Sequence, residues 1–401
     1  MKYRQTMKKM AALGLGLTMA ASLKAQDLAL TKEFVNKNMH DAIAQYKTLT
    51  ARVPAGVLPR TINKANDSLI TAKSNSWISG FYPGTLLYLY EYSQDADLLK
   101  EAENRLQLLE KEKNNKGTHD LGFMLYCSFG NALRLTDNKR YRDILLTGAE
   151  SLASRFNPTV GCIRSWDHNG DKWKFPVIID NMMNLEFLNW ASRVSGNPKY
   201  VDISKIHANT TLKNHFRPDN SSYHVIDYDP ATGAVRNKHT HQGADHESAW
   251  ARGQAWGLYG YTLMYRDIKD KAYLNQARKI AAFILDHPNL PEDGIPYWDY
   301  SVSGPDVPRD ASAAAITASA LLELSGMVKG KESKRYLQAA EHMLTSLSSP
   351  AYKAPIGTNG GFLLMHSTGH LPGNSEIDVP LSYADYYYVE ALIRYNHLLN
   401  R

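Results

Sequence analysis

Cysteine is scarce in this chain: Cys127 and Cys162 are the only two among 401 residues. Two cysteines cannot build the dense disulfide framework that stabilises small secreted domains. Cys127 also lies in an apolar stretch with helical spacing, where a free thiol packs as a small hydrophobic group. The sequence therefore favours free, buried thiols, although an exported protein would have the oxidising surroundings that a disulfide needs.

Long apolar runs are missing as well. The apolar stretch at residues 10–23 is shorter than the roughly 20 residues of a transmembrane helix, and no later run is long enough. It follows a basic segment, residues 2–9, and ends in Leu23-Lys24-Ala25, a pattern typical of a cleaved secretory signal. We predict a signal peptide at residues 1–25 and no membrane insertion. Because no lipobox cysteine follows the signal, we expect a periplasmic protein.

An excess of positive charge is lacking once this signal is set aside. The formal net charge is +6, and residues 1–25 hold five basic residues and no acidic one. About +1 therefore remains for the mature chain. Nucleic-acid-binding proteins draw much of their affinity from clustered positive charge, so we expect no nucleic-acid partner. The sequence also contains no phosphate-binding glycine loop and no Gly-x-Ser-x-Gly elbow.

Two motifs resemble metal sites only in part. His239 and His241 alternate as on a strand, but zinc would need a third ligand, and no His-Glu-x-x-His motif or cysteine partner supplies one. Residues 167–171 look like the start of a calcium loop. Lys172 stands where that loop needs glycine, and Ile178 where it needs a bidentate glutamate, so a plain turn is favoured. We expect neither a metal nor an organic cofactor.

What the sequence does contain is a regular succession of helices. Apolar residues recur at helical spacing in twelve segments. Their predicted spans are 32–50, 77–94, 97–112, 121–136, 139–155, 181–195, 199–214, 248–267, 270–286, 311–327, 332–347 and 383–399. Alternate segments are apolar or aromatic on most faces, which indicates burial, and the others are richer in Lys, Glu and Gln on one face.

This alternation predicts an all-α fold of the six-hairpin toroid type, an (α/α)6 barrel with an inner and an outer ring of helices. Short links such as residues 136–138 and 195–198 join the helices of a pair. Longer segments rich in Gly and aromatic residues separate several pairs, and residues 223–236 have the turn signals of a short hairpin. Since no linker interrupts the pattern, we predict one catalytic domain over residues 26–401.

Two aspartates stand where long segments give way to inner helices. Asp120 precedes Leu121-Gly122-Phe123, and Asp180 precedes Asn181-Met182-Met183. Either aspartate alone could simply cap its helix. Because all the long segments lead into the inner ring, however, the two carboxylates should face one crevice. Such a pair suits acid–base chemistry on a sugar, with one carboxyl kept protonated and the other ionised.

Aromatic and hydrogen-bonding residues occupy the same positions along the chain. Trp77 begins the first inner helix, and Trp250, Arg252 and Trp256 begin the fourth. Aromatic faces stack on the C–H surfaces of a sugar ring, and polar groups bind its hydroxyls. The planar fork of Arg252 would suit a carboxylate or a sulfate. Trp250 and Trp256 are six residues apart, so at least one of them is expected to belong to the core.

Four motifs together resemble those of the unsaturated glucuronyl hydrolases, glycoside hydrolase family 88. They are Trp77-x-Ser79-Gly80-Phe81, His119-Asp120-x-Gly122-Phe123, Ile179-Asp180-x-Met182-Met183-Asn184 and Trp250-x-Arg252-Gly253-Gln254-Ala255-Trp256. The resemblance covers nearly the whole mature chain and implies the (α/α)6 barrel. It also implies the substrates: unsaturated glycosaminoglycan disaccharides or oligosaccharides, which lyases leave with a 4,5-unsaturated glucuronic acid at the non-reducing end.

The resemblance further implies a mechanism and a set of site residues. The double bond would be protonated at C4 and hydrated at C5, after which the hemiketal opens and expels the rest of the sugar. Asp180 would be the general acid and then the base for water, and Asp120 the second essential carboxylate. The implied substrate-binding residues are Trp77, Phe81, His119, Trp166, His224, Gln242, Trp250, Arg252 and Trp256. Ser367, in the loop before the last helix, could contact a sulfate or hydroxyl group.

Other functions stay open from the sequence. An unsaturated rhamnogalacturonyl hydrolase acting on pectin fragments would share the toroid and part of the motifs. A non-catalytic glycan-binding protein of the cell envelope would use the same aromatic residues, but it has no need of two facing carboxylates. A sugar epimerase would use paired histidines as bases, for which His239 and His241 are the candidates. We expect a monomer or a weak dimer.

Overall fold

The computed structural model describes residues 29–400, so the predicted signal peptide lies outside the described residues. Most of the described chain is helical, which confirms the helical class predicted from the sequence. Within it, no helix combines the length and the apolar character needed to cross a membrane. The helices, with η marking 3-10 and π segments, are α1 (Lys32–Arg52), α2 (Phe81–Ser93), α3 (Ala96–Leu109), η2 (Glu110–Asn114), η3 (Gly122–Gly130), α4 (Asn131–Thr136), α5 (Lys139–Ala153), η4 (Ile179–Asn184), α6 (Leu185–Ser195), α7 (Pro198–Asn214), α8 (Ala251–Ile268), α9 (Lys271–Asp286), α10 (Ala311–Ser325), α11 (Gly330–Leu347), η5 (Asn359–Gly361) and α12 (Ser382–Leu399).

Each of the twelve predicted segments has a helical counterpart, but two of them begin irregularly. The segment predicted at 121–136 starts as a π-helix, η3, and continues as α4. The segment predicted at 181–195 starts as a 3-10 helix, η4, and continues as α6. π segments within helices are often found at functional sites. The first irregular start follows Asp120 by two residues, and the second contains Asp180 in its first turn.

Short antiparallel sheets occupy the long connections. Their strands are β1 (Leu58–Asn63) with β2 (Ser68–Ala72), β3 (Phe156–Asn157) with β4 (Cys162–Ile163), β5 (Pro176–Ile178) with β6 (Val225–Tyr228) and β7 (Val235–His239), and β8 (Ser367–His370) with β9 (Ser375–Val379). The hairpin predicted around residues 223–236 corresponds to β6 and β7. The other strands were not predicted. Both cysteines are free thiols, with Cys162 buried and Cys127 partly exposed.

Four hairpins are joined by the same two-residue link. The first link residue ends the inner helix in the left-handed conformation, and the second caps the outer helix with an Asp or Asn side chain. The links are Gln94-Asp95, Asp137-Asn138, Gly196-Asn197 and Lys269-Asp270. In each, the Asp or Asn oxygen accepts a hydrogen bond from the backbone two residues later. These local signals make the helix pairs antiparallel and tight.

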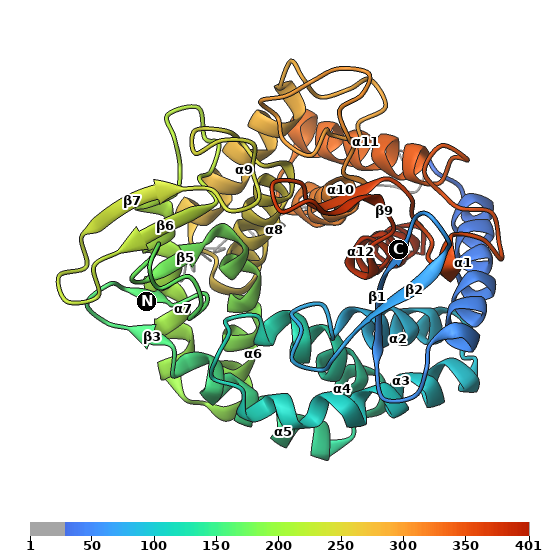
Figure 1. Ribbon diagram of the computed structural model, residues 1–401, viewed down its shortest axis with the longest axis horizontal. Coiled ribbons are helices and arrows are strands. Elements are labelled where there is room, and N and C mark those ends of the chain that lie inside the picture. Colours follow the sequence, from blue (N-terminus) through green and yellow to red (C-terminus); the bar gives the residue numbers. More distant parts are fainter. Residues whose placement is uncertain (1–28, 401) are drawn as a thin grey trace, which may run out of the picture.

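The inner helices form a closed sequence of contacts. α2 packs on η3, η3 on η4 and α6, these on α8, α8 on α10, α10 on α12, and α12 returns to α2. Figure 1 shows this ring with α3, α5, α7, α9 and α11 outside it, and with α1 beside α12 at the closing point. Since α1 is the partner of α12, the two ends of the described chain complete one hairpin.

Burial distinguishes the two sets of helices. In α10, every residue except Glu323 is buried, and its alanines and serines let it pack closely against α8, α11 and α12. In α11, only one face is buried, as expected for an outer helix. Close packing also fixes η4: a Cβ added to Gly260 of α8 would lie 2.4 Å from Met182 Cβ. The segment that carries Asp180 therefore rests directly on α8.

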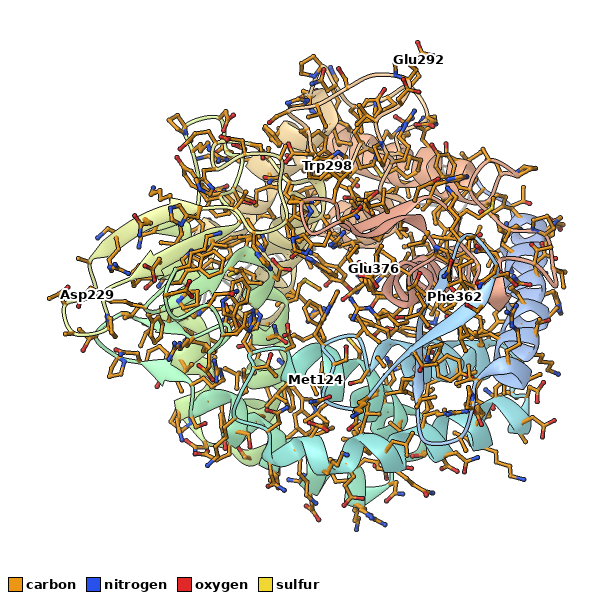
Figure 2. All side chains as sticks on the ribbon, viewed as in Figure 1. Met124, Asp229, Glu292, Trp298, Phe362 and Glu376 are labelled. Atoms are coloured by element: carbon orange, nitrogen blue, oxygen red, sulfur yellow. The ribbon has the colours of Figure 1, made fainter. Side chains whose placement is uncertain are left out.

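The loops and sheets gather where the inner helices begin. β1 and β2 precede α2, β5 leads into η4, β7 leads toward α8, and β8 and β9 precede α12. Figure 2 shows Glu376 of β9 near the middle of the ring. The short links lie at the other ends of the inner helices, so this rim alone carries long connections.

Asp385 holds the closing hairpin together. Its buried carboxyl group accepts hydrogen bonds from the amides of Leu363 (2.9 Å) and Leu364 (2.9 Å) and from the Tyr46 hydroxyl of α1 (3.2 Å). Burial raises the pKa of Asp385 to about 7, and the two amide hydrogen bonds oppose this rise. One side chain thus ties α1, α12 and the preceding loop together.

Replacing Asp385 by alanine should destabilise the protein strongly. Asp385→Ala leaves two buried amides and a hydroxyl without an acceptor, which should lower the free energy of unfolding by about 3 kcal/mol or more. Asp270→Ala, which removes an exposed helix cap, should cost only about 1 kcal/mol. Urea unfolding followed by circular dichroism measures both. Equal losses for the two variants would contradict the role given to Asp385.

Candidate functional site

A cavity of about 280 Å³ lies at the rim where the inner helices begin. Seven of the twelve residues predicted for the site line it. They are Trp77, His119, Asp120, Trp166, Asp180, Gln242 and Arg252. The other lining residues are Arg60, Gly117, Thr118, His168, Ile178, His241, Gly369, His370, Glu376 and Tyr383. The two aspartates from distant parts of the sequence therefore share one cavity.

Buried polar groups without a hydrogen-bond partner are concentrated at this cavity. Five of its lining side chains carry such an atom: His119, Trp166, Asp180, Arg252 and Tyr383. A larger cavity of about 370 Å³ lies among later turns of the inner helices, and none of its lining residues has one. Since buried polar atoms are normally paired, the smaller cavity is the one built to receive a polar ligand.

Asp180 is the most unusual of these groups. It lies in the first turn of η4, is 8% exposed, and its Oδ2 has no hydrogen-bond donor. Burial raises the pKa of Asp180 to about 7, the positive charge of Arg252 opposes this rise, and the negative charge of Asp120 adds to it. A carboxyl group with this pKa can both donate and accept a proton near neutral pH.

His224 places a ring N–H group near Asp180. Its Nδ1 accepts hydrogen bonds from the amides of His241 and Gln242, both at 3.1 Å, so the ring proton must be on Nε2. Nε2 has no other partner and lies 3.8 Å from Asp180 Oδ2. Burial lowers the pKa of His224 well below its usual range, so the ring is neutral. The Trp250 ring packs against it at 4.4 Å.

Asp120 is bound on both oxygens by its own neighbours in sequence. The Thr118 hydroxyl donates to Oδ2 at 2.6 Å, and His119 Nε2 lies 3.2 Å from Oδ1. Burial lowers the pKa of His119, so this imidazole is neutral. Neither Asp120 nor Asp180 makes a side-chain hydrogen bond that caps the helix after it. The capping role that the sequence left open for them is therefore wrong.

Arg252 lines the cavity, but most of its guanidinium group is bound within the protein. It is 1% exposed; Nη1 donates to Asp310 at 2.8 Å and to the carbonyl of Thr368 at 2.6 Å. Nη2 donates to the carbonyl of Gly369 at 2.6 Å, which leaves only Nε without a partner. Gln242 Nε2 also donates to Gly369, at 2.9 Å. Both side chains thus hold the β8–β9 hairpin at the cavity.

Five of the predicted residues do not line the cavity: His224, Phe81, Trp250, Trp256 and Ser367. Phe81 and Trp256 are fully buried among aromatic rings of the inner ring, where Trp256 packs on Phe123 at 5.0 Å. Trp250 supports His224 from behind. Ser367 is buried in β8, with its hydroxyl unpartnered.

Several lining residues were not predicted as site residues. Arg60 comes from β1, and Glu376 from β9, and the two form a forked ion pair at 2.6 and 3.0 Å. His241 and His370 lie side by side, with ring centres 4.6 Å apart. His241 was considered in the sequence only as a zinc ligand or as a base, and His370 was not singled out as a site residue. His241 and His370 come together only because two separate loops meet in the fold, and no local sequence pattern predicts that meeting.

The structure gives no support to a zinc site at His239 and His241. His239 Nδ1 accepts a hydrogen bond from Trp173 Nε1 at 3.1 Å, whereas His241 faces the cavity. Within residues 29–400, no group of three or more His, Cys, Asp or Glu side chains is placed to hold a metal ion.

Comparison with known proteins gives consistent relatives. The model of glycosyl hydrolase family 88 matches residues 56–397. An unsaturated glucuronyl hydrolase of Formosa agariphila is 48% identical over 357 residues, which cover 88% of each chain. The crystal structure of an unsaturated glucuronyl hydrolase specific for heparin has a TM-score of 0.89 at 50% identity, over 92% of this chain and 99% of that one. A mutant unsaturated glucuronyl hydrolase of Streptococcus agalactiae, complexed with dGlcA-GalNAc6S, has a TM-score of 0.79 at 27% identity, over 94% and 96%.

The raised pKa of Asp180 should make the protein less stable as pH rises. The folded state favours the protonated carboxyl up to about pH 7, whereas the unfolded chain loses this proton near pH 4. Asp180→Asn has no such proton to lose. We expect it to match the wild type near pH 4 and to be more stable above pH 7, by about 4 kcal/mol at most.

Urea unfolding between pH 4 and 9 measures this difference. Asp229→Asn, in the turn between β6 and β7, is the matched control because backbone amides of that turn lower the pKa of Asp229. Its stability relative to the wild type should fall with rising pH, opposite in sign to Asp180→Asn. If the advantage of Asp180→Asn did not depend on pH, Asp180 would not have a raised pKa.

Proposed function

This chain belongs to glycoside hydrolase family 88, and we propose that it is an unsaturated glucuronyl hydrolase that acts on glycosaminoglycan fragments. It releases the 4,5-unsaturated glucuronic acid from the non-reducing end of disaccharides or oligosaccharides produced by lyases. The observation that carries this proposal is the buried Asp180 carboxyl, which faces the cavity with an unpartnered oxygen and a pKa raised to about 7.

The substrate's double bond defines what the site must supply. It joins C4 and C5 and is an enol ether, because the ring oxygen is bonded to C5. Protonated Asp180 gives its proton to C4, and positive charge develops at C5 and the ring oxygen. A water molecule then attacks C5 and returns a proton to the Asp180 carboxylate. The resulting hemiketal opens, and the next sugar is released with its own hydroxyl group.

The surrounding groups suit both halves of this cycle. The Nε2–H group of His224 points at Asp180 from 3.8 Å and can steady the carboxylate after it has given up its proton. The buried charge of Arg252 favours the same ionised form. The negative charge of Asp120 helps to keep the pKa of Asp180 raised, so that Asp180 is protonated again before the next turnover. Asp180 can therefore act first as a general acid and then as a general base.

The cavity lining offers several N–H groups that can bind the oxygen atoms of a sugar. Arg60, His168, His241 and His370 belong to it, and Glu376 pairs with Arg60. Burial lowers the pKa of His241 and of His370, so both rings are neutral hydrogen-bonding groups. A heparin-specific relative with half of its residues identical supports a glycosaminoglycan fragment. We propose heparin-derived disaccharides as the first substrates to test, with chondroitin and hyaluronan fragments next.

Two alternatives from the sequence receive less support. Pectin-derived galacturonyl-rhamnose is less favoured because the relatives that match most of this chain are unsaturated glucuronyl hydrolases. A non-catalytic binding protein would have no use for a buried carboxyl that is held half-ionised at neutral pH. The enzyme is the better explanation of Asp180.

Further parts of the proposal rest on other observations. The closed order of contacts among the inner helices supports the (α/α)6 barrel, in one domain over residues 26–401. The basic and apolar pattern of residues 1–25 supports export to the periplasm through a cleaved signal. We propose that the mature enzyme acts as a monomer or a weak dimer.

The hydrolase activity is tested through the ultraviolet absorbance of the conjugated uronate. Wild-type protein should abolish this band in unsaturated heparin, chondroitin or hyaluronan disaccharides, because hydration removes the double bond. Asp180→Asn should lower kcat by roughly 10³-fold or more, since it removes the group that carries the proton. Asp229→Asn should keep wild-type activity. An unchanged band in every disaccharide with wild-type protein would refute the proposed function.

The pH dependence should follow the protonation of Asp180. As a general acid it must be protonated, so kcat/KM should fall as pH rises above about 7. In Asp120→Asn, the negative charge that helps raise this pKa is gone. The alkaline limb of the remaining activity should then move to lower pH. The measurement is the rate of band loss between pH 5 and 9; a limb that stays in place would show that Asp120 does not tune Asp180.

A further inference from the structure

The helix that follows Asp120 is capped in an uncommon way. Asp120 occupies the position before the first helical residue, from which an Asp side chain usually accepts hydrogen bonds from the amides two and three residues later. Five other Asp or Asn side chains of this protein do make a capping bond of this kind. They are Asp95, Asn138, Asn197, Asp270 and Asp310. The carboxylate of Asp120 does not.

The amides that Asp120 would normally bind are taken by Asn184. Asn184 Oδ1 accepts hydrogen bonds from the amides of Gly122 at 2.9 Å and Phe123 at 3.2 Å. Asn184 is fully buried and lies at the end of η4, more than sixty positions away in sequence. A Cβ on Gly122 would lie 2.6 Å from Asn184 Oδ1 and 2.8 Å from its Cα, so only glycine permits this contact.

The contact leaves the Asp120 carboxylate free to face the cavity. With Gly122 and Phe123 satisfied from outside, the Asp120 oxygens instead meet the Thr118 hydroxyl and His119. Asn184 also follows Asp180 by four residues in the same η4 segment. One amide side chain therefore joins the two backbone segments that carry the two aspartates.

We propose that Asn184 is a positioning residue, which caps the Asp120 helix in place of Asp120 and so sets the geometry of both carboxylates. The effect of Asn184 on turnover rests on the proposed function, but its capping role does not. Without Asn184, the carboxylate of Asp120 turns to the vacant amides of its own helix. It then leaves the cavity, where its charge holds the pKa of Asp180 high.

Hydrogen exchange of the peptide that spans residues 121–126, followed by mass spectrometry, tests the capping role without any substrate. In Asp120→Ala the exchange rate should equal that of the wild type, because Asp120 is not the cap. In Asn184→Ala it should rise little, because Asp120 takes over. In the double variant it should rise about fivefold or more, since no cap remains. Faster exchange in Asp120→Ala alone, or wild-type exchange in the double variant, would overturn the proposal.

Kinetics test the consequence for the site. Asn184→Ala should lower kcat roughly 10²-fold with little change in KM, because the chemistry is misaligned while substrate contacts persist. Asn184→Asp keeps an acceptor for both amides and should keep most of the capping. Asn189→Ala is the matched control: Asn189 is buried on α6 and donates to Asp267 at 3.1 Å, away from both aspartates. A loss of kcat in Asn189→Ala equal to that in Asn184→Ala would refute a specific role.

The two proposals fail in different ways. If the wild type leaves every unsaturated disaccharide unchanged, the proposed function fails, while the exchange rates still decide whether Asn184 is the cap. If the wild type is active and Asp120→Ala alone exchanges faster, the function stands and the positioning role fails. The Asp120→Ala measurement needs no change at Asn184, so it is decisive even if Asn184→Ala does not fold.

Discussion

The site depends on one physical constraint, a carboxyl group that is buried and yet has no hydrogen-bond donor on one oxygen. The simplest way to satisfy Asp180 would be an ion pair with Arg252, whose charge is close enough to influence it. Arg252 is instead committed to Asp310 and to the carbonyls of Thr368 and Gly369, so no ion pair with Asp180 forms among the described residues. A fully paired Asp180 would have a low pKa and could not act as an acid. The carboxyl group of Asp180 therefore stays without an ion-pair partner because Arg252 is bound to other groups.

The same arrangement makes the β8–β9 hairpin part of the site. The carbonyls of β8 compensate the buried guanidinium, and β9 is held by the ion pair between Glu376 and Arg60. Glu376 and Asp378 both have a positive φ, at 55° and 53°, which few residues other than glycine adopt without strain. A strained hairpin with a charged partner on each of its two strands fits a role in shaping the cavity.

The sequence predicted the helices well because their signals are local. Helical spacing of apolar residues and the two-residue links, such as Asp137-Asn138, are both visible within a few residues. Asp120 and Asp180 could be singled out for the same reason, since each lies at a helix start. The partners of these residues could not, because they come through space from hairpins and loops. Arg60, Glu376 and His370 have no local pattern, and the capping of Gly122 by Asn184 joins segments far apart in sequence. Arg252 was recognised, but its bonds to Asp310 and to the β8–β9 hairpin were not.

The pairing of α1 with α12 has a consequence for how the protein folds. Five hairpins can form from neighbouring parts of the chain, but the sixth joins its two ends, as in the hydrogen bond between Tyr46 and Asp385, 339 residues apart. Closing a loop of that length costs about 5 kcal/mol of chain entropy by the logarithmic rule. The cavity also draws Arg60 from the beginning of the chain and Tyr383 from its end. Until α12 packs against α1 and α2, the chain can hold the other five hairpins but no complete active site, so the contact that closes the ring also completes the cavity.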